Sequence, residues 1–463
     1  MSASADLVAL AAGLERVGAR AVCLLDGAGA GAAGDDGGLG RYSFLGCDPD
    51  AVVVVDDVAA AGAESVTAAL ARLDALLAEA DAAVAAEAAA DGGPWPLAMG
   101  FVGYELGRAF ERLPVVRRTH ATPDLAVYRF PAVLRVDHSS GRSRVLARSP
   151  AAGAALEARL AAAAQAGQGP TPLPPPVVGP LSWGVTEAAY AAAVERVLEY
   201  LRAGDAYQVN YTTRLEADVG PGALPELYRA LRAAAPPLGA YLALDGGGAI
   251  LSTSPELFLR VSARDGAGLR RVETRPIKGT RARGRSAAAD AAEAAALRAD
   301  PKERAEHLMI VDLERNDLGR VCEVGSVHVE DYGRVVTLPT LHHVVSTVAG
   351  TLRPDVGPAA LLAATFPCGS ITGAPKVRAM QLIAELEAQT RGVYTGAIGY
   401  FGARGALELS VAIRTAVVDR TTNRLSFGVG GGIVVDSTPA QEWAECRLKA
   451  AGLARALGLP HAP

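Results

Sequence analysis

The chain has 463 residues, of which 45 are Lys or Arg and 50 are Asp or Glu, and it carries a net charge of −5. This acidic balance argues against a nucleic-acid partner, which needs a basic surface, but a few local cations can still bind a small anion. Half of the residues are apolar, so a large core is expected. Five scattered cysteines without a C-x-x-C spacing argue against a disulfide framework or a structural zinc site.

The N-terminus and the apolar runs predict a cytoplasmic protein without a membrane partner. The first six residues, MSASAD, lack a basic segment followed by an apolar core, so no signal peptide is expected. Acidic residues interrupt the alanine-rich run from Ala78 to Ala90, which is therefore no candidate for a membrane span.

Residues 1–166 form the first predicted region. It contains strand-like runs at Ala51 to Val55 and Leu125 to Val136, and it ends in an alanine-rich helix over residues 151–166. Residues 167–180, with the sequence GQGPTPLPPPVVGP, are typical of a semi-rigid linker.

Residues 181–457 form the second predicted region, without another obvious break. It opens with an amphipathic helix over Thr186 to Leu201. The following run, Ala206 to Leu215, alternates as a strand does and places Gln208 on a polar face. That face is either a solvated surface or part of a site inside a large sheet.

Residues 274–281, with the sequence TRPIKGTR, place Lys278 in a turn-like context of Pro, Gly and Thr. A lysine in a desolvated pocket can lose its proton and act as an amine nucleophile. Taken alone, the motif is more typical of a solvated surface lysine beside a turn.

Two predicted helices, which begin near residues 300 and 438, each carry a pair of glutamates three residues apart. The pairs are Glu303 with Glu306 and Glu442 with Glu445. Each pair shares a helical face, and either pair alone is typical of a solvated helix. Both pairs together, in the region that holds Lys278, predict a Mg²⁺ site built from carboxylate oxygens.

The last predicted strands also carry site candidates. Leu407 to Val418 alternates and places Arg414 opposite the core, between two small alanines that leave room for a ligand. Leu425 to Val434 follows and puts Gly428, Gly430 and Gly432 on one face. Glycines there favour the close approach of a ligand, or of another packed element.

Between Ala203 and Ala450 a set of motifs follows in one order: GDAYQVN from Gly204, SPELF from Ser254, the lysine motif, AEHLMIVDL from Ala305, HVVS from His343, GSITGAPK from Gly369 and AIRT from Ala412. Together they resemble the chorismate-binding domain shared by anthranilate, aminodeoxychorismate, isochorismate and salicylate synthases. Residues 1–166 match more loosely, through GRYSFLG from Gly40 and GYELGR from Gly103.

The resemblance implies an α+β protein with the anthranilate synthase component I-like fold. In that fold two large antiparallel sheets pack together and helices lie outside. The alternating strands and the absence of a regular βαβ spacing agree with it.

The resemblance also implies how the site residues are used. The ring carboxylate of chorismate would meet Mg²⁺ held by Glu306 and Glu445, with Glu303 and Glu442 binding it directly or through water. The remaining substrate-binding residues implied by the family are Thr280, Tyr394, Arg414, Gly430, Gly432 and Lys449.

Within that set, Arg414 and Tyr394 would hold the enolpyruvyl carboxylate, and Lys449 would complete the metal end. His343 would assist proton transfer, whereas its neighbour His342 is expected to be a hydrogen-bonded core histidine.

Two positions select among members of the family. Water-using members have a lysine near the position of Gln208, and anthranilate synthases usually have alanine at the position of Lys278. The pair found here implies amination of chorismate at C4, through a covalent adduct on Lys278, to form the precursor of 4-aminobenzoate for folate.

No glutaminase nucleophile is evident in the chain, so the ammonia is expected from a separate glutamine amidotransferase subunit. One alternative is anthranilate synthase component I, of tryptophan biosynthesis. A second is a non-catalytic, ligand-sensing homologue that binds tryptophan near Leu24 to Asp26 and Arg41 to Ser43.

Overall fold

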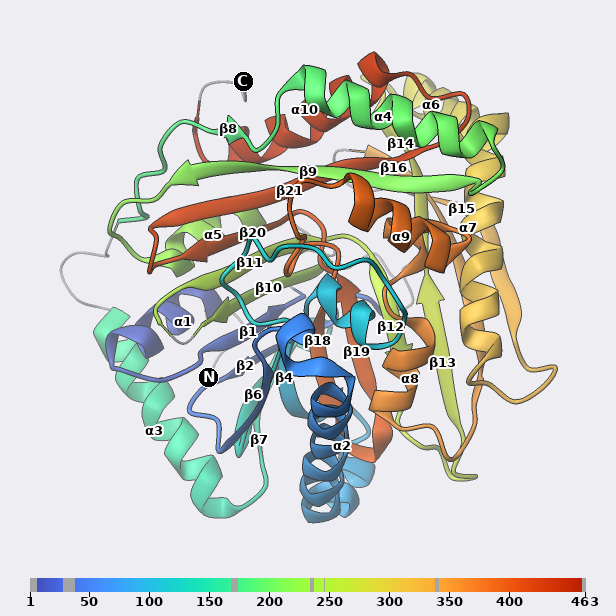
Figure 1. Cartoon of the computed structure of the whole chain (residues 1–463). Coiled ribbons are helices and arrows are strands. Elements are labelled where there is room, and N and C mark those ends of the chain that lie inside the picture. The colour runs from blue at the N-terminus through green and yellow to red at the C-terminus, as the bar shows by residue number, and fades with distance from the viewer. Residues whose placement is uncertain are drawn as a thin grey trace.

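Two antiparallel sheets build the centre of the protein, and helices cover their outer faces (Figure 1). The computed structural model describes residues 6–27, 38–167, 174–233, 237–244, 246–337 and 341–459. Every strand pairing among these residues is antiparallel, which confirms the predicted fold.

The first sheet contains strands from both predicted regions. In spatial order its strands are β17 (Gly373–Ala374), β9 (Gln208–Asp218), β21 (Arg424–Ile433), β20 (Thr415–Asp419), β11 (Ala249–Ser254), β10 (Leu238–Ala243), β1 (Cys23–Asp26), β2 (Tyr42–Gly46), β6 (Ala132–Asp137) and β7 (Arg142–Ala147), and β8 (Ser182–Trp183) pairs with β9. The two regions join where β1 pairs with β10, with Leu24 opposite Tyr241.

The second sheet also contains strands from both predicted regions. Its strands are β14 (Ile277–Ala282), β16 (Leu341–Leu352), β13 (Arg270–Arg275), β12 (Leu257–Val261), β19 (Leu407–Val411), β18 (Ala397–Gly402), β4 (Pro96–Val102), β5 (Leu125–Arg129) and β3 (Ala51–Val55), and β15 (His328–Thr337) pairs with β16. Here the regions join through β4 and β18, with Gly100 opposite Gly399. Residues 1–166 therefore share continuous hydrogen bonding with the second region in both sheets.

The helices are α1 (Leu7–Arg16), α2 (Val58–Asp91), α3 (Pro150–Gly167), α4 (Glu187–Arg202), α5 (Leu224–Arg232), α6 (Ala287–Ala299), α7 (Pro301–Gly319), α8 (Pro358–Thr365), α9 (Lys376–Leu386) and α10 (Pro439–Ala456). Helices α4 and α10 lie over β9 and β21 at the top of Figure 1, and α7 lies beside β14 and β16. No helix in the described part of the chain is both long and apolar enough to cross a bilayer.

Several predicted elements match closely, and the predicted helix starts are confirmed. Asp300 caps α7 by accepting from the amides of Lys302 and Glu303, and Thr438 caps α10. Of the predicted linker, residues 168–173 lie outside the described residues.

Three predicted elements differ from the structure. The run from Leu125 to Val136 forms β5 and β6, which belong to different sheets, and Leu407 to Val418 likewise divides into β19 and β20. Arg414 lies between β19 and β20, where the chain passes from one sheet to the other, and its φ of 50° bends the chain there.

The lysine motif is also not a turn. It forms edge strand β14, whose pairing with β16 shifts register between Lys278 and Thr280. Gly279, with a φ of 68°, provides the bulge that lets the strand continue.

Candidate functional site

Lys278 lies on edge strand β14, half-buried among acidic side chains. Its Nζ donates to the carbonyl oxygen of Ser370, 3.3 Å away, in the short helix η2 (Gly369–Ile371). Burial raises the pKa values of Glu256, Glu303 and Glu306, and the positive charge of Lys278 opposes that rise in all three. The predicted nucleophile therefore lies close to one of the predicted carboxylate pairs, Glu303 and Glu306.

Glu256 is a site residue to which the sequence assigned no role. It follows β11 and is only 4% exposed, and its Oε1 has no hydrogen-bond partner among the described residues. Burial raises its pKa, while hydrogen bonds from Ser370 and the Ile277 amide, and the charges of Lys278 and Arg414, oppose the rise. A carboxyl placed between Pro255 and a buried strand, where an apolar residue is usual, is the signal that could have identified it.

The four predicted metal-binding glutamates converge from α7 and α10. Burial raises the pKa values of Glu303, Glu306 and Glu442, and repulsion adds to the rise between Glu303 and Glu445 and between Glu306 and Glu442. Partly buried carboxyl groups that repel one another across two helices fit a divalent cation with oxygen ligands.

Two glycines leave space beside these glutamates. A Cβ at Gly431 would lie 2.9 Å from Oε2 of Glu442, and one at Gly279 would lie 3.1 Å from Oε2 of Glu303. Lys449 borders the same group, with its Nζ 2.7 Å from Oε1 of Glu445 and donating to the carbonyl of Gly430.

The tightest acidic cluster lies elsewhere. Among the described residues, ligand atoms of three such side chains come within 4.8 Å of one another only at Glu105, His120 and Asp124. Arg118 pairs with Asp124 at 3.1 Å, and both Glu105 oxygens accept backbone amides, from Arg391 and Gly392. The carboxylates of that cluster already have hydrogen-bond and ion-pair partners within the protein. These bonds connect the N-terminal region to the loop that carries Tyr394. The four glutamates are more widely spaced, which suits Mg²⁺ because it retains several waters.

Arg414 places a positively charged guanidinium near Glu256. It is more than a third exposed, yet surrounding protein atoms desolvate its guanidinium and lower its pKa, with Glu256 opposing. Its backbone carbonyl is fixed by the amide and hydroxyl of Thr253. Among the described residues the guanidinium has no ion-pair partner, so it is available to an anionic ligand.

Tyr394 packs tightly against β21. A Cβ at Gly428 would lie 2.2 Å from two carbons of the Tyr394 ring, so only glycine fits there. Gly432 lies on the same face of β21 and leaves room for the Gln208 side chain. A Cβ added at Gly432 would lie 2.6 Å from Nε2 of Gln208. Neither polar atom of the buried Gln208 amide has a partner among the described residues. Such an amide is rare in a finished core and is typical of a site that binds a polar ligand.

His343 lies on β16 opposite Thr280. Its Nδ1 is 3.1 Å from the Gly279 carbonyl and 3.0 Å from Thr280 Oγ1, and its Nε2 is buried without a partner among the described residues. Burial lowers the pKa of His343 to about 4, and the charge of Arg414 also lowers it. The ring is therefore neutral near pH 7, and Nε2 is able to accept a proton. His342 instead binds Asp290 and Thr337, as expected for a structural histidine.

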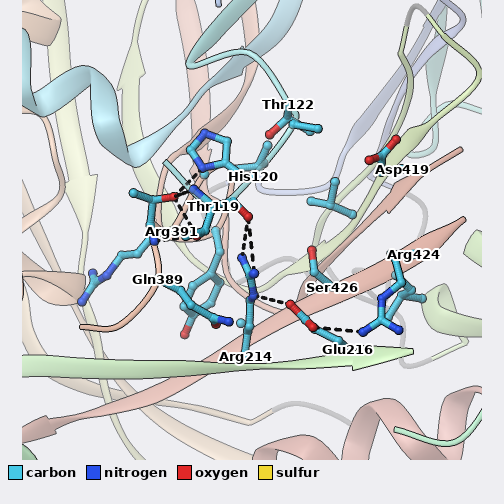
Figure 2. A pocket seen from close by; sticks show the side chains of 18 of the residues that line it. Thr119, His120, Thr122, Arg214, Glu216, Gln389, Arg391, Asp419, Arg424 and Ser426 are labelled. Carbon is cyan, nitrogen blue, oxygen red and sulfur yellow. Dashed lines mark hydrogen bonds and ion pairs between the residues drawn. The ribbon is translucent and has the colours of Figure 1, made fainter. Parts of the chain in front are cut away.

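A cavity of about 370 Å³ lies beside this site, and its lining does not include the four glutamates or Lys278. It is lined by the loops at residues 119–122 and 388–394 and by strands β9, β20 and β21, and it shares Tyr394 and Gly428 with the site. Figure 2 shows that two arginines of this cavity are already paired, since Arg214 and Arg424 both reach Glu216. This cavity is therefore separate from Lys278 and the four glutamates.

A model of the chorismate binding enzyme family matches residues 37–455. The chain belongs to that family. It is 43% identical over 384 residues to an aminodeoxychorismate synthase of Streptomyces griseus, covering 79% of this chain and 51% of that protein. It is 40% identical to aminodeoxychorismate synthase component 1 of Salmonella typhimurium, and the match covers 75% of this chain and 74% of that protein. It is also 40% identical to anthranilate synthase component 1 of Streptomyces coelicolor, covering 75% and 70%.

Solved structures agree with this assignment to the chorismate-binding enzymes. Anthranilate synthase component I from Streptococcus pneumoniae superposes with a TM-score of 0.73 at 29% identity, covering 90% of this chain and 92% of that one. The isochorismate synthase MenF from Escherichia coli, at 18% identity, shares the fold with a TM-score of 0.72 and covers 98% and 91%. The family and the fold predicted from the sequence are therefore confirmed. The chain spans about half the length of the two Streptomyces aminodeoxychorismate synthases that it matches.

Proposed function

We propose that this chorismate-binding enzyme aminates chorismate at C4 to form 4-amino-4-deoxychorismate, the precursor of 4-aminobenzoate in folate biosynthesis. The single observation that carries the proposal is Lys278, which lies beside buried Glu256 and within the electrostatic reach of two glutamates. The neutral Gln208 amide supports it, because a water-activating base is absent from that position.

Lys278 acts as the nucleophile. After its ammonium has given up a proton to solvent, the amine attacks ring carbon C2, the ring double bonds shift, and the C4–O bond breaks. Glu256, whose pKa is raised by burial, supplies the proton with which the hydroxyl leaves as water. The proton released by the attacking nitrogen returns to Glu256.

Ammonia then attacks C4, the double bonds shift back, and the C2–N bond breaks to release Lys278. The departing lysine nitrogen takes back a proton from Glu256. His343 relays to solvent the proton that the new C4 ammonium loses, because its Nε2 is buried, neutral and unpartnered among the described residues. Glu256 then takes up a proton from solvent, so both residues regain their initial states.

The substrate is held at both ends. Arg414 and Tyr394 bind the enolpyruvyl carboxylate, and one charge-assisted hydrogen bond of this kind contributes about 1.5–3 kcal/mol. Thr280, the backbone around Gly430 and Gly432, and Lys449 orient the ring. The hydrogen bond from Nζ of Lys449 to the Gly430 carbonyl, together with its ion pair to Glu445, holds that lysine beside the glutamates.

Mg²⁺ is the proposed cofactor. Glu306 and Glu445 hold it, with Glu303 and Glu442 binding directly or through water. When bound, Mg²⁺ offsets the repulsion among these carboxylates and binds the ring carboxylate of the substrate.

A separate glutamine amidotransferase subunit is the proposed source of ammonia, in the cytoplasm. The component 1 names of two relatives support a partner, since they denote one part of a larger enzyme. Anthranilate synthase component I is the second candidate function, favoured by relatives and a solved structure of that name.

Product analysis tests the proposal. The protein is incubated with chorismate, Mg²⁺ and ammonium, and the products are separated by chromatography. Aminodeoxychorismate is expected. Anthranilate would instead establish the second function, and salicylate would show that water is the nucleophile.

A further inference from the structure

Glu314 is a fully buried carboxyl for which the proposed reaction has no use. It lies on α7, two turns beyond Glu306, and is only 3% exposed. No cation forms an ion pair with it among the described residues. Its hydrogen-bond partners are the hydroxyl of Thr274, at 2.8 Å, and the thiol of Cys368, at 3.4 Å. An acidic group without a cationic partner in a core is costly when ionised.

These contacts connect Glu314 to the reactive pair. The Sγ of Cys368 is also 3.3 Å from the hydroxyl of Ser370. The Ser370 side chain hydrogen bonds Glu256, and its carbonyl accepts from Lys278. Helix η2 packs directly on Glu314, because a Cβ at Gly369 would lie 3.7 Å from its Cγ. A line of hydrogen-bonding groups thus runs from α7 to Glu256 and ends beside the nucleophile.

We propose that Glu314 is a positioning residue that carries a proton in the active enzyme and thereby sets the direction of the hydrogen-bond chain through Cys368 and Ser370 to Glu256. This inference rests on the proposed function of Lys278 and Glu256.

The direction follows from counting donors. A protonated Glu314 donates to Sγ of Cys368, so the single S–H is free to point at Ser370, and the Ser370 hydroxyl then donates to Glu256. An ionised Glu314 can only accept, so it takes the S–H for itself. Ser370 then loses its donor, and the chain is interrupted between Cys368 and Ser370.

The surroundings favour the protonated form. Burial raises the pKa of Glu314 to about 8, and the charges of Glu256 and Asp317 add to the rise, while the bonds from Thr274 and Cys368 oppose it. Lys376 pairs with the neighbouring Asp317, at 2.5 Å, and not with Glu314. Burial also raises the pKa of the Cys368 thiol, so it remains a donor.

Glu314→Gln tests the proposal, because an amide keeps a donor at this position at every pH. Chorismate consumption is measured against pH with the free ammonia concentration held constant. Wild-type turnover should be about tenfold below its plateau one pH unit above the Glu314 midpoint, whereas Glu314→Gln should show no such decline. Asp312→Asn is the matched control, since it removes a charge from the exposed side of the same helix and should retain the wild-type profile.

Cys368 provides a rescue pair. Cys368→Ser keeps a donor and acceptor and should retain the wild-type pH profile, whereas Cys368→Ala breaks the chain and should lower turnover at every pH. A Glu314→Gln enzyme that declines with pH as wild type does would overturn the proposal.

A measurement on the free enzyme separates this proposal from the proposed reaction. Infrared difference spectra should show the carbonyl band of a protonated carboxylic acid at neutral pH, which disappears as the pH is raised and is absent from Glu314→Gln. The S–H band of Cys368 should shift over the same pH range. If the band of Glu314 is missing at neutral pH, the residue is ionised, the chain is interrupted at Cys368, and the proposal fails, whichever product the enzyme forms.

Discussion

Gly428→Ala should displace Tyr394 from the substrate site. The added Cβ would lie 2.2 Å from Cγ and Cδ1 of the Tyr394 ring, whereas carbon atoms at rest are about 3.5–4.0 Å apart. The ring or strand β21 must therefore move by more than ~1 Å. Overpacking of this kind costs about 1–3 kcal/mol of folding free energy.

The same displacement should weaken chorismate binding. If the Tyr394 hydroxyl contributes one hydrogen bond to a carboxylate, its loss removes about 1.5–3 kcal/mol, which corresponds to a ~10- to 150-fold rise in KM. The assays are denaturant unfolding, followed by circular dichroism, and steady-state kinetics with chorismate.

Two comparisons isolate the cause. Gly452→Ala is the matched control, since this glycine lies inside α10 with open space around its Cα. That change should leave KM unchanged and stabilise the helix by up to ~1 kcal/mol. In the Tyr394→Phe background, Gly428→Ala should still lower stability but add little to KM, because the hydroxyl is already absent. Wild-type stability and KM in Gly428→Ala would refute the packing of Tyr394 described here.

Three further predictions address the chemistry and the pH response. Lys278→Ala should abolish the adduct that mass spectrometry detects after incubation with chorismate alone, and should redirect ammonia to C2; an unchanged rate of aminodeoxychorismate formation would show that the lysine is structural. Glu306→Gln and Glu445→Gln should each fold normally, as judged by circular dichroism, but lose most turnover and the response to Mg²⁺; turnover without metal in both would place these carboxylates outside the reaction. His343 has a pKa lowered to about 4 by burial, so the unfolded chain binds its proton first as the pH falls and stability declines between about pH 6.5 and 4. His343→Asn should reduce that decline by up to ~3 kcal/mol in denaturant titrations, leaving the parallel contribution of His307, whose pKa is also lowered to about 4; an unchanged decline would contradict a neutral buried His343.

Local chemistry explains what could be predicted from the sequence alone. The caps of α7 and α10 and the i,i+3 spacing of the glutamates depend on neighbours within one turn, so the predicted helices began where the structure begins them. The order of motifs was long and specific enough to identify the family. The alternation of β9 correctly placed Gln208 on the strand face that meets Gly432.

The tertiary structure decided which strands cross between sheets and which polar groups are buried. Alternation with a period of two continues through a crossover, so nothing local separates β19 from β20 or reveals that Arg414 occupies the bend between them. The same holds for Glu256 and Glu314, because the pKa of a carboxyl depends on desolvation by segments far away in the chain. The sequence by itself therefore determined the chemical groups and the family, and long-range packing determined which of those groups meet beside Lys278.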